Sequence, residues 1–183
     1  MREPESPAPP AESSGSGAGA PIAESHGERR AGQPGGHLLL SLLTGEFHVD
    51  PHALQGLDDQ LEQAGHDLGA LKKLLTKNKV VSEDIYQQAV ARLLGLDFDP
   101  HLDGAELLPE FTKVIPIRYA KKFAFFPIRM SADQLWVAVE NPQEFEPVDD
   151  VGRKLERRVR QVVSTHQAIF SLINRAYDRA EET

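Results

Sequence analysis

The sequence predicts an α+β protein: a small helical bundle of two helix pairs followed by a small α/β sandwich, in which helices cover a three-stranded sheet. Apolar residues recur at helical spacing between residues 37 and 98, and short β-rich runs alternate with helical segments between 105 and 180. Residues 1–36 have neither pattern. The predicted organisation is therefore a tail over 1–36, a helical subdomain over 37–98, a connector over 99–104 and an α/β subdomain over 105–180.

The tail is rich in Pro, Gly, Ala, Ser and Glu. A segment of this composition buries too little apolar surface to offset the entropy lost when its chain is ordered. We therefore expect residues 1–36 to be disordered.

Four helices are expected in the helical subdomain. Asp50, which precedes a proline, predicts the start of the second helix, which runs to residue 64; Asp67 can cap the third helix and Ser82 the fourth. Gly95 suits the left-handed position that follows the end of a helix.

A weak internal repeat supports this pairing of helices. Shifting the chain by 32 residues aligns residues 42–44 with 74–76 and Val49 with Val81. Each copy is a helix, a loop that ends in valine, and a second helix. Two such pairs can bury their apolar faces against each other.

The pattern changes after residue 98. The runs 124–130 and 135–140 predict a β-hairpin, and 159–163 predicts a third strand. A helix is expected over 147–158, and another after Ser164, which opens a capping-box pattern.

The chain is 183 residues long and 40% hydrophobic, which is enough for one or two small domains. Its formal net charge of −8 argues against nucleic-acid binding, which needs an excess of Lys and Arg. The absence of cysteine excludes disulfides, thiolate catalysis and cysteine-ligated zinc. No apolar run of about 18 residues and no signal peptide is present, so we expect a cytoplasmic protein without direct membrane insertion.

The stretches IPIRYAKKFAFFPI, LWVAVENP, VDDV and IFSLINRAY, in this order behind a helical module, resemble the N-terminal domain of type II secretion and type IV pilus assembly ATPases (GspE/PilB N-terminal, MshEN-like). The resemblance covers roughly residues 37 to 180. In that family this domain links a hexameric motor to the inner-membrane platform through a partner's cytoplasmic domain, and some members bind cyclic di-GMP.

The resemblance implies a noncatalytic protein-interaction or regulatory domain that docks a cytoplasmic partner of an envelope machine. The chain is then either the isolated N-terminal part of such an ATPase or a free-standing relative. The alternative is a cyclic di-GMP-binding sensor domain. Because no glycine is followed by lysine, a phosphate-binding loop is excluded, and we expect no enzyme activity, cofactor or metal site.

Two basic groups are the candidates for partner binding. They comprise Lys72, Lys73, Lys77 and Lys79 at the end of the third helix, and Arg153, Lys154, Arg157 and Arg158 in the α/β subdomain. Such a run is usually a solvated charged face, and docking of an acidic partner surface is the alternative for each group.

The nucleotide alternative has its own candidates, Leu68, Gly69, Leu74 and Leu75. The family's nucleotide motif begins with Arg-Leu-Gly and closes with Gln. Here Asp67 stands before Leu68, where a phosphate ligand needs a guanidinium, and Leu93 stands at the closing position. The sequence therefore favours docking over nucleotide binding.

Overall fold

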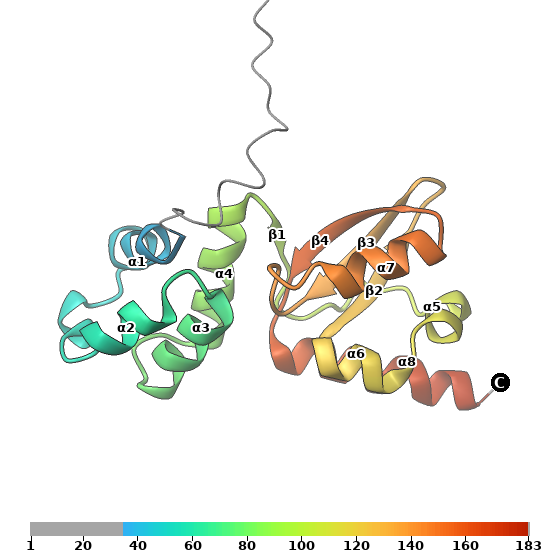
Figure 1. Cartoon of the computed structure of the whole chain (residues 1–183). Coiled ribbons are helices and arrows are strands. Elements are labelled where there is room, and N and C mark those ends of the chain that lie inside the picture. Colours follow the sequence, from blue (N-terminus) through green and yellow to red (C-terminus); the bar gives the residue numbers. More distant parts are fainter. Residues whose placement is uncertain (1–34, 183) are drawn as a thin grey trace, which may run out of the picture. The chain divides into compact units, whose positions relative to one another are not determined.

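The structure is a computed structural model that describes residues 35–182. The predicted disordered tail lies outside the described residues, apart from Gly35 and Gly36, which begin the first helix. Figure 1 shows the described residues as a helical part followed by a part that contains the sheet.

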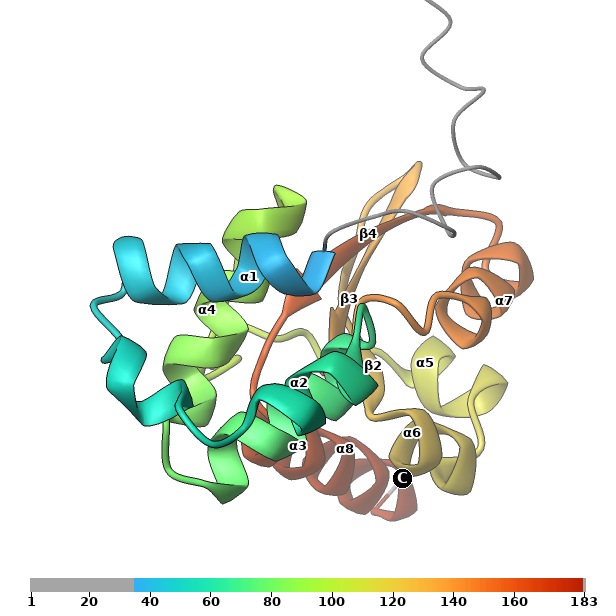
Figure 2. The same ribbon diagram turned by 60° about the vertical axis from the view of Figure 1, so that its left-hand side comes forward.

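The helical part contains α1 (Gly35–Gly45), the 3-10 helix η1 (Pro51–Leu54), α2 (Asp58–Ala64), α3 (Leu68–Lys77) and α4 (Glu83–Leu94). Helices α1 and α4 lie side by side, as do α2 and α3 (Figure 2). The predicted second helix is divided into η1 and α2. The division occurs at Gly56, whose φ of 85° is incompatible with a right-handed helix.

The predicted caps of α3 and α4 are confirmed. The Asp67 side chain accepts a hydrogen bond from the amide of Ala70 at 3.1 Å, and Ser82 accepts one from the amide of Ile85 at 3.3 Å. Gly95 follows α4 with a φ of 68°. These bonds satisfy helix amides that would otherwise have no partner.

The sequence repeat has a structural counterpart. Leu43 and Leu75, which the repeat aligns, are both buried in the core of the helical part, as are Val49 and Val81. The two copies therefore contribute equivalent positions to one core.

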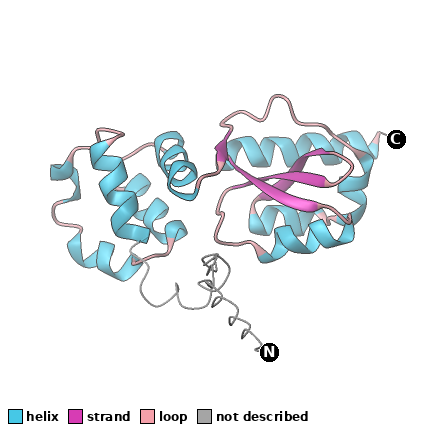
Figure 3. Ribbon diagram, turned by 90° about the horizontal axis from the view of Figure 1, so that it is seen from above, coloured by secondary structure: helices cyan, strands magenta, loops and turns pink. Residues whose placement is uncertain are grey.

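The α/β part contains β1 (Asp97–Phe98), α5 (Pro109–Val114), α6 (Ile117–Phe123), β2 (Phe125–Met130), β3 (Gln134–Val139), α7 (Glu146–Lys154), β4 (Arg158–Val163) and α8 (His166–Glu181). The strand order is β1-β4-β3-β2. The predicted hairpin is the antiparallel pair β2 and β3, and β4 pairs with β3 in parallel. Figure 3 shows the strands surrounded by the helices of this part.

The sheet has four strands instead of the predicted three. The additional strand, β1, is only two residues long and pairs Asp97 with Val162 and Phe98 with Val163. A pair of residues is too short to show an alternating pattern, so the sequence could not predict it.

The start of α8 also differs from the prediction. Thr165, one residue after Ser164, caps the helix by accepting a hydrogen bond from the amide of Ala168 at 3.2 Å. Ser164 is fully buried and continues the sheet, because its amide donates to the carbonyl of Val139.

The buried residues form two hydrophobic clusters, one in each part. The predicted connector over 99–104 lies next to the second cluster, because Leu102 is 1% exposed and packs in it. Asp99 accepts hydrogen bonds from the amides of His101 and Leu102. The proposed division at 99–104 remains a prediction.

Candidate functional site

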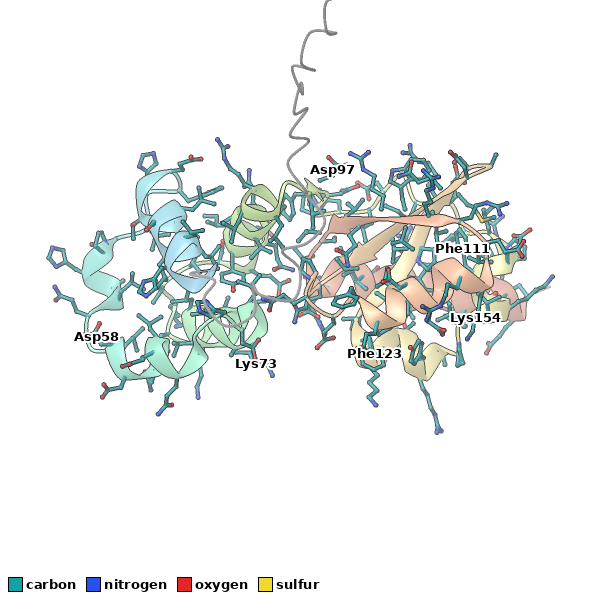
Figure 4. The ribbon with its side chains drawn as sticks, turned by 45° about the horizontal axis from the view of Figure 1, so that its top comes forward. Asp58, Lys73, Asp97, Phe111, Phe123 and Lys154 are labelled. Carbon is teal, nitrogen blue, oxygen red and sulfur yellow. The ribbon has the colours of Figure 1, made fainter. Side chains whose placement is uncertain are left out.

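A cleft of about 620 Å³ lies where the helical part meets the α/β part. Helices α3 and α4 form one wall, and the other is formed by the end of α6, the end of β3 with its following loop, and the start of α8. Figure 4 labels Lys73 and Phe123, which line the cleft from the helical part and the α/β part.

An ion-pair network crosses the base of this cleft. Lys72 Nζ lies 2.8 Å from Glu83 Oε2 and 2.7 Å from Glu140 Oε1, and the Lys72 side chain is only 11% exposed. Glu83 also accepts a hydrogen bond from the amide of His166 at 2.8 Å. We call Lys72, Glu83, Glu140 and His166 the junction network, because its members come from both parts of the molecule.

Glu140 is the centre of the junction network. Its second carboxylate oxygen lies 2.9 Å from His166 Nδ1. Burial by itself raises the pKa of Glu140, but the hydrogen bonds and charges of Lys72 and His166 outweigh burial and hold that pKa below its ordinary value of 4.5. Glu140 is therefore charged at neutral pH.

Two glutamines add hydrogen bonds between the parts. Gln87, which is 1% exposed, donates from Nε2 to the carbonyl oxygens of Glu140 and Ser164 at 2.8 and 2.7 Å. Gln143 accepts from the amide of Leu68 and donates to the carbonyl of His66. The start of α3 and the first half of α4 are thus hydrogen-bonded to the α/β part.

Lys73 and Lys122 remain exposed on the rims of the cleft. Lys122 Nζ lies 5.2 Å from the ring centre of Phe123, a cation–π contact. The rims of the cleft therefore present the positive charges of two lysines, one of them beside an aromatic ring. The charge of Lys72, by contrast, is already neutralised by two carboxylates.

A second hollow, of about 610 Å³, lies at the far end of α3. Lys79 lines it, with apolar surface from Phe47, Val80 and Ile85. Ile85 is 37% exposed although it is a large apolar residue. Lys77 is exposed on the last turn of the same helix. Lys77 and Lys79 with this hollow are called the α3-end surface below.

The second predicted basic group divides into exposed and structural members. Arg153 and Lys154 are exposed on α7 and lie 3.5 and 3.2 Å from the carboxylate of Asp150. Arg157 is half-buried and donates to the carbonyls of Ser131, Leu155 and Glu156, which holds the turn before β4. Arg158 is exposed at the start of β4.

Residues 94–183 match the family model described as the MshEN domain. This match begins at the last residue of α4 and takes in the whole α/β part. The chain is also homologous to the type IV pilus assembly ATPase PilB of Thermus thermophilus, with 29% identity over 119 residues. That match covers 62% of this chain and only 13% of PilB.

Two solved structures share the fold. The structure of MshE with cdg (cyclic di-GMP) has a TM-score of 0.57 and 21% identity, covering 76% of this chain and 98% of that chain. The N-terminal domain of XpsE has a TM-score of 0.52 and 19% identity, covering 79% of this chain and 96% of its own. At these identities the similarity shows a shared fold.

The nucleotide candidates lie on α3, ahead of the MshEN domain match. Leu75 is fully buried in the helical core, and Leu74 is partly buried. Leu68 is 4% exposed, and its amide and carbonyl bond Gln143 and Tyr86. Gly69 lines the cleft, and a Cβ atom there would lie 3.2 Å from Asn141 Nδ2. Of the four, Leu68 and Gly69 line the cleft, whereas Leu74 and Leu75 do not.

Sequence reasoning missed Glu140, Gln87 and His166, which line the cleft with Lys72. It also missed Gln143, which bonds the backbone of His66 and Leu68. Glu140 and Gln143 flank the Asn-Pro turn that ends the hairpin strand β3 in the α/β part. A carboxylate at the end of a buried strand is the one signal that could have indicated a polar site. Its partners come from α3 and α8, and no pattern along the chain relates those helices to it.

No group of three or more His, Cys, Asp or Glu side chains within residues 35–182 is arranged to hold a metal ion. None of the helices in this range is long and apolar enough to cross a membrane.

Proposed function

We propose that this chain is a noncatalytic docking domain that binds a cytoplasmic partner protein of a secretion or pilus assembly machine. Its match to the MshEN domain and its homology to PilB support a place in such machinery. The proposal places the protein on the cytoplasmic side of the membrane.

The observation that carries the proposal is the α3-end surface. It combines the exposed side chain of Ile85 and the half-buried ring of Phe47 with two lysines that the structure leaves without a carboxylate partner among residues 35–182. Exposed apolar surface beside unpaired charge is typical of an interface, because burial supplies affinity and the charges orient the partner. Lys77 and Lys79 are therefore the favoured partner-binding residues, and Lys73 extends the basic surface along α3.

Lys72 and Arg157 have structural roles within the molecule, so no partner protein is needed to explain why these two positions are basic. Lys72 is held by two carboxylates and Arg157 by three carbonyls. The remaining candidates of the second basic group are Arg153, Lys154 and Arg158, which are exposed.

Affinity capture with the purified chain as bait tests the docking role. The partner is expected to be the cytoplasmic domain of a platform protein, and the Lys77→Glu/Lys79→Glu variant should capture less of it. Equal capture by the variant would remove the α3-end surface from the proposal. The chain should not bind ATP in calorimetry, because it has no Gly-Lys phosphate loop.

A cyclic di-GMP sensor is the second candidate. The cleft supports it, since Lys73 and Lys122 can meet phosphates and the fold is that of MshE, which was solved with this ligand. The acidic Asp67, which caps α3, counts against it at the position of the motif's arginine. Calorimetry with cyclic di-GMP distinguishes the two: stoichiometric binding that Lys73→Ala and Lys122→Ala weaken would favour the sensor.

A further inference from the structure

Two arginines flank a tryptophan in a row across the sheet of the α/β part. In the strand register Arg129 of β2 is opposite Trp136 of β3, and Trp136 is opposite Arg160 of β4. Residues in direct register project from the same face of a sheet. Arg158 precedes Arg160 by two residues and so projects from that face as well.

The row is exposed and rich in unpaired positive charge. Arg129 and Arg158 are exposed, and neither has a carboxylate partner within residues 35–182. The guanidinium carbon of Arg129 lies 3.9 Å from the ring centre of Trp136, which is half-buried. This stacking fixes the Arg129 side chain over the ring and leaves its outer N–H groups directed to solvent.

We propose that the Arg129–Trp136–Arg160 row docks an acidic segment of a partner protein, with one carboxylate on each arginine and an apolar group over the tryptophan. Strands are about 4.8 Å apart, so the two arginines are spaced about 10 Å apart, within the span of a short peptide. Trp and Arg are the residues most enriched at the energetic centres of interfaces. The proposal rests on the docking function proposed above and adds a second surface to it.

A carboxylate already present on the row indicates the chemistry of the partner. Arg160 Nη2 lies 3.3 Å from Asp97 Oδ2, and the two side chains are 52% and 61% exposed. An exposed pair of this kind is weak, and an incoming carboxylate can replace it. Asp97 therefore acts as an internal competitor for one of the two arginines.

The experiment uses poly-L-glutamate as the probe and Trp136 as the reporter, because it is the only tryptophan of the chain. Binding is measured as the change in tryptophan fluorescence of the full chain. Arg129→Gln and Arg160→Gln should each weaken binding about threefold, the effect of losing one exposed ion pair. Asp97→Asn should strengthen binding about threefold, since it frees Arg160.

Arg118→Gln, which removes an exposed arginine from α6, is the matched control and should leave binding unchanged. The proposal is overturned if Asp97→Asn does not strengthen binding, or if Arg118→Gln weakens it as much as the row variants do. Tighter, row-dependent binding of an oligothymidine strand would also overturn it in favour of nucleic acid. Because the probe is synthetic, this experiment tests the row alone. The row proposal can fail while a natural partner still binds the α3-end surface, and the row can bind poly-L-glutamate while the α3-end surface binds no partner.

Discussion

Lys72 on α3 lies 2.7 Å from the carboxylate of Glu140 at the end of β3. These two residues come from the helical part and the α/β part and are 68 positions apart in the sequence. The Glu140 side chain is 23% exposed, so the pair is shielded from most of the solvent. A shielded charge pair is costly to break, because the remaining charge is left without a partner.

Glu140→Gln should lower the free energy of unfolding at pH 7 by about 1–3 kcal/mol, since Lys72 and His166 lose their charged acceptor. The pKa of Glu140 is held below 4.5, so its contribution is present above the unfolded pKa and is lost as the pH falls through the folded pKa. Urea unfolding should therefore show a gap between wild type and variant at pH 7 that narrows below about pH 4.5.

Glu144→Gln is the control for this experiment, because Glu144 is exposed and lines the same cleft. A gap for Glu140→Gln that stays constant down to pH 3 would contradict the ion-pair account.

Gln87→Ala should destabilise the protein by about 1–3 kcal/mol, because it leaves the buried carbonyls of Glu140 and Ser164 without their donor. Gln88→Ala on the next, exposed position of α4 is the matched control and should change stability by less than about 0.5 kcal/mol. Thermal melts of both variants measure the difference. If the two melt alike, Gln87 does not hold the parts together.

Much of the fold follows from local sequence signals. Ser82 and Gly95 delimit α4, and the two short β-rich runs of β2 and β3 specify the hairpin, because both signals are contained within a few residues. The break at Gly56 was not predicted, since apolar residues continue at helical spacing across it.

The cleft could not be predicted in the same way. The charge of Lys72 predicts a partner-binding residue, yet the structure places Glu83 and Glu140 within ion-pair distance of it. Whether a lysine is free or paired depends on contacts between distant segments, which spacing along the chain does not encode.

Gly152→Ala should lower the melting temperature, because a Cβ atom on α7 would lie 2.4 Å from Val159 Cγ2 and 3.1 Å from the carbonyl of Arg157. The expected cost is about 1–3 kcal/mol, typical of overpacking. Gly45→Ala is the control, since a Cβ at Gly45 has no neighbour within 4 Å. Equal melting of the two variants would show that α7 can shift away from β4 at little cost.

Leu75→Ala should destabilise the chain by about 2–5 kcal/mol, because Leu75 is fully buried in the helical core. Urea unfolding measures this loss, with Lys77→Ala on the same helix as the exposed control. A small loss for Leu75→Ala, together with lost cyclic di-GMP binding, would instead make Leu75 a ligand contact.

The most direct test of the docking account is calorimetry, which measures the affinity of the purified chain for the cytoplasmic domain of the proposed platform partner. We expect the Lys77→Glu/Lys79→Glu variant to bind at least about tenfold more weakly while its melting temperature stays at the wild-type value, because both side chains are exposed. Undiminished binding by a variant that is folded as stably as the wild type would contradict the account.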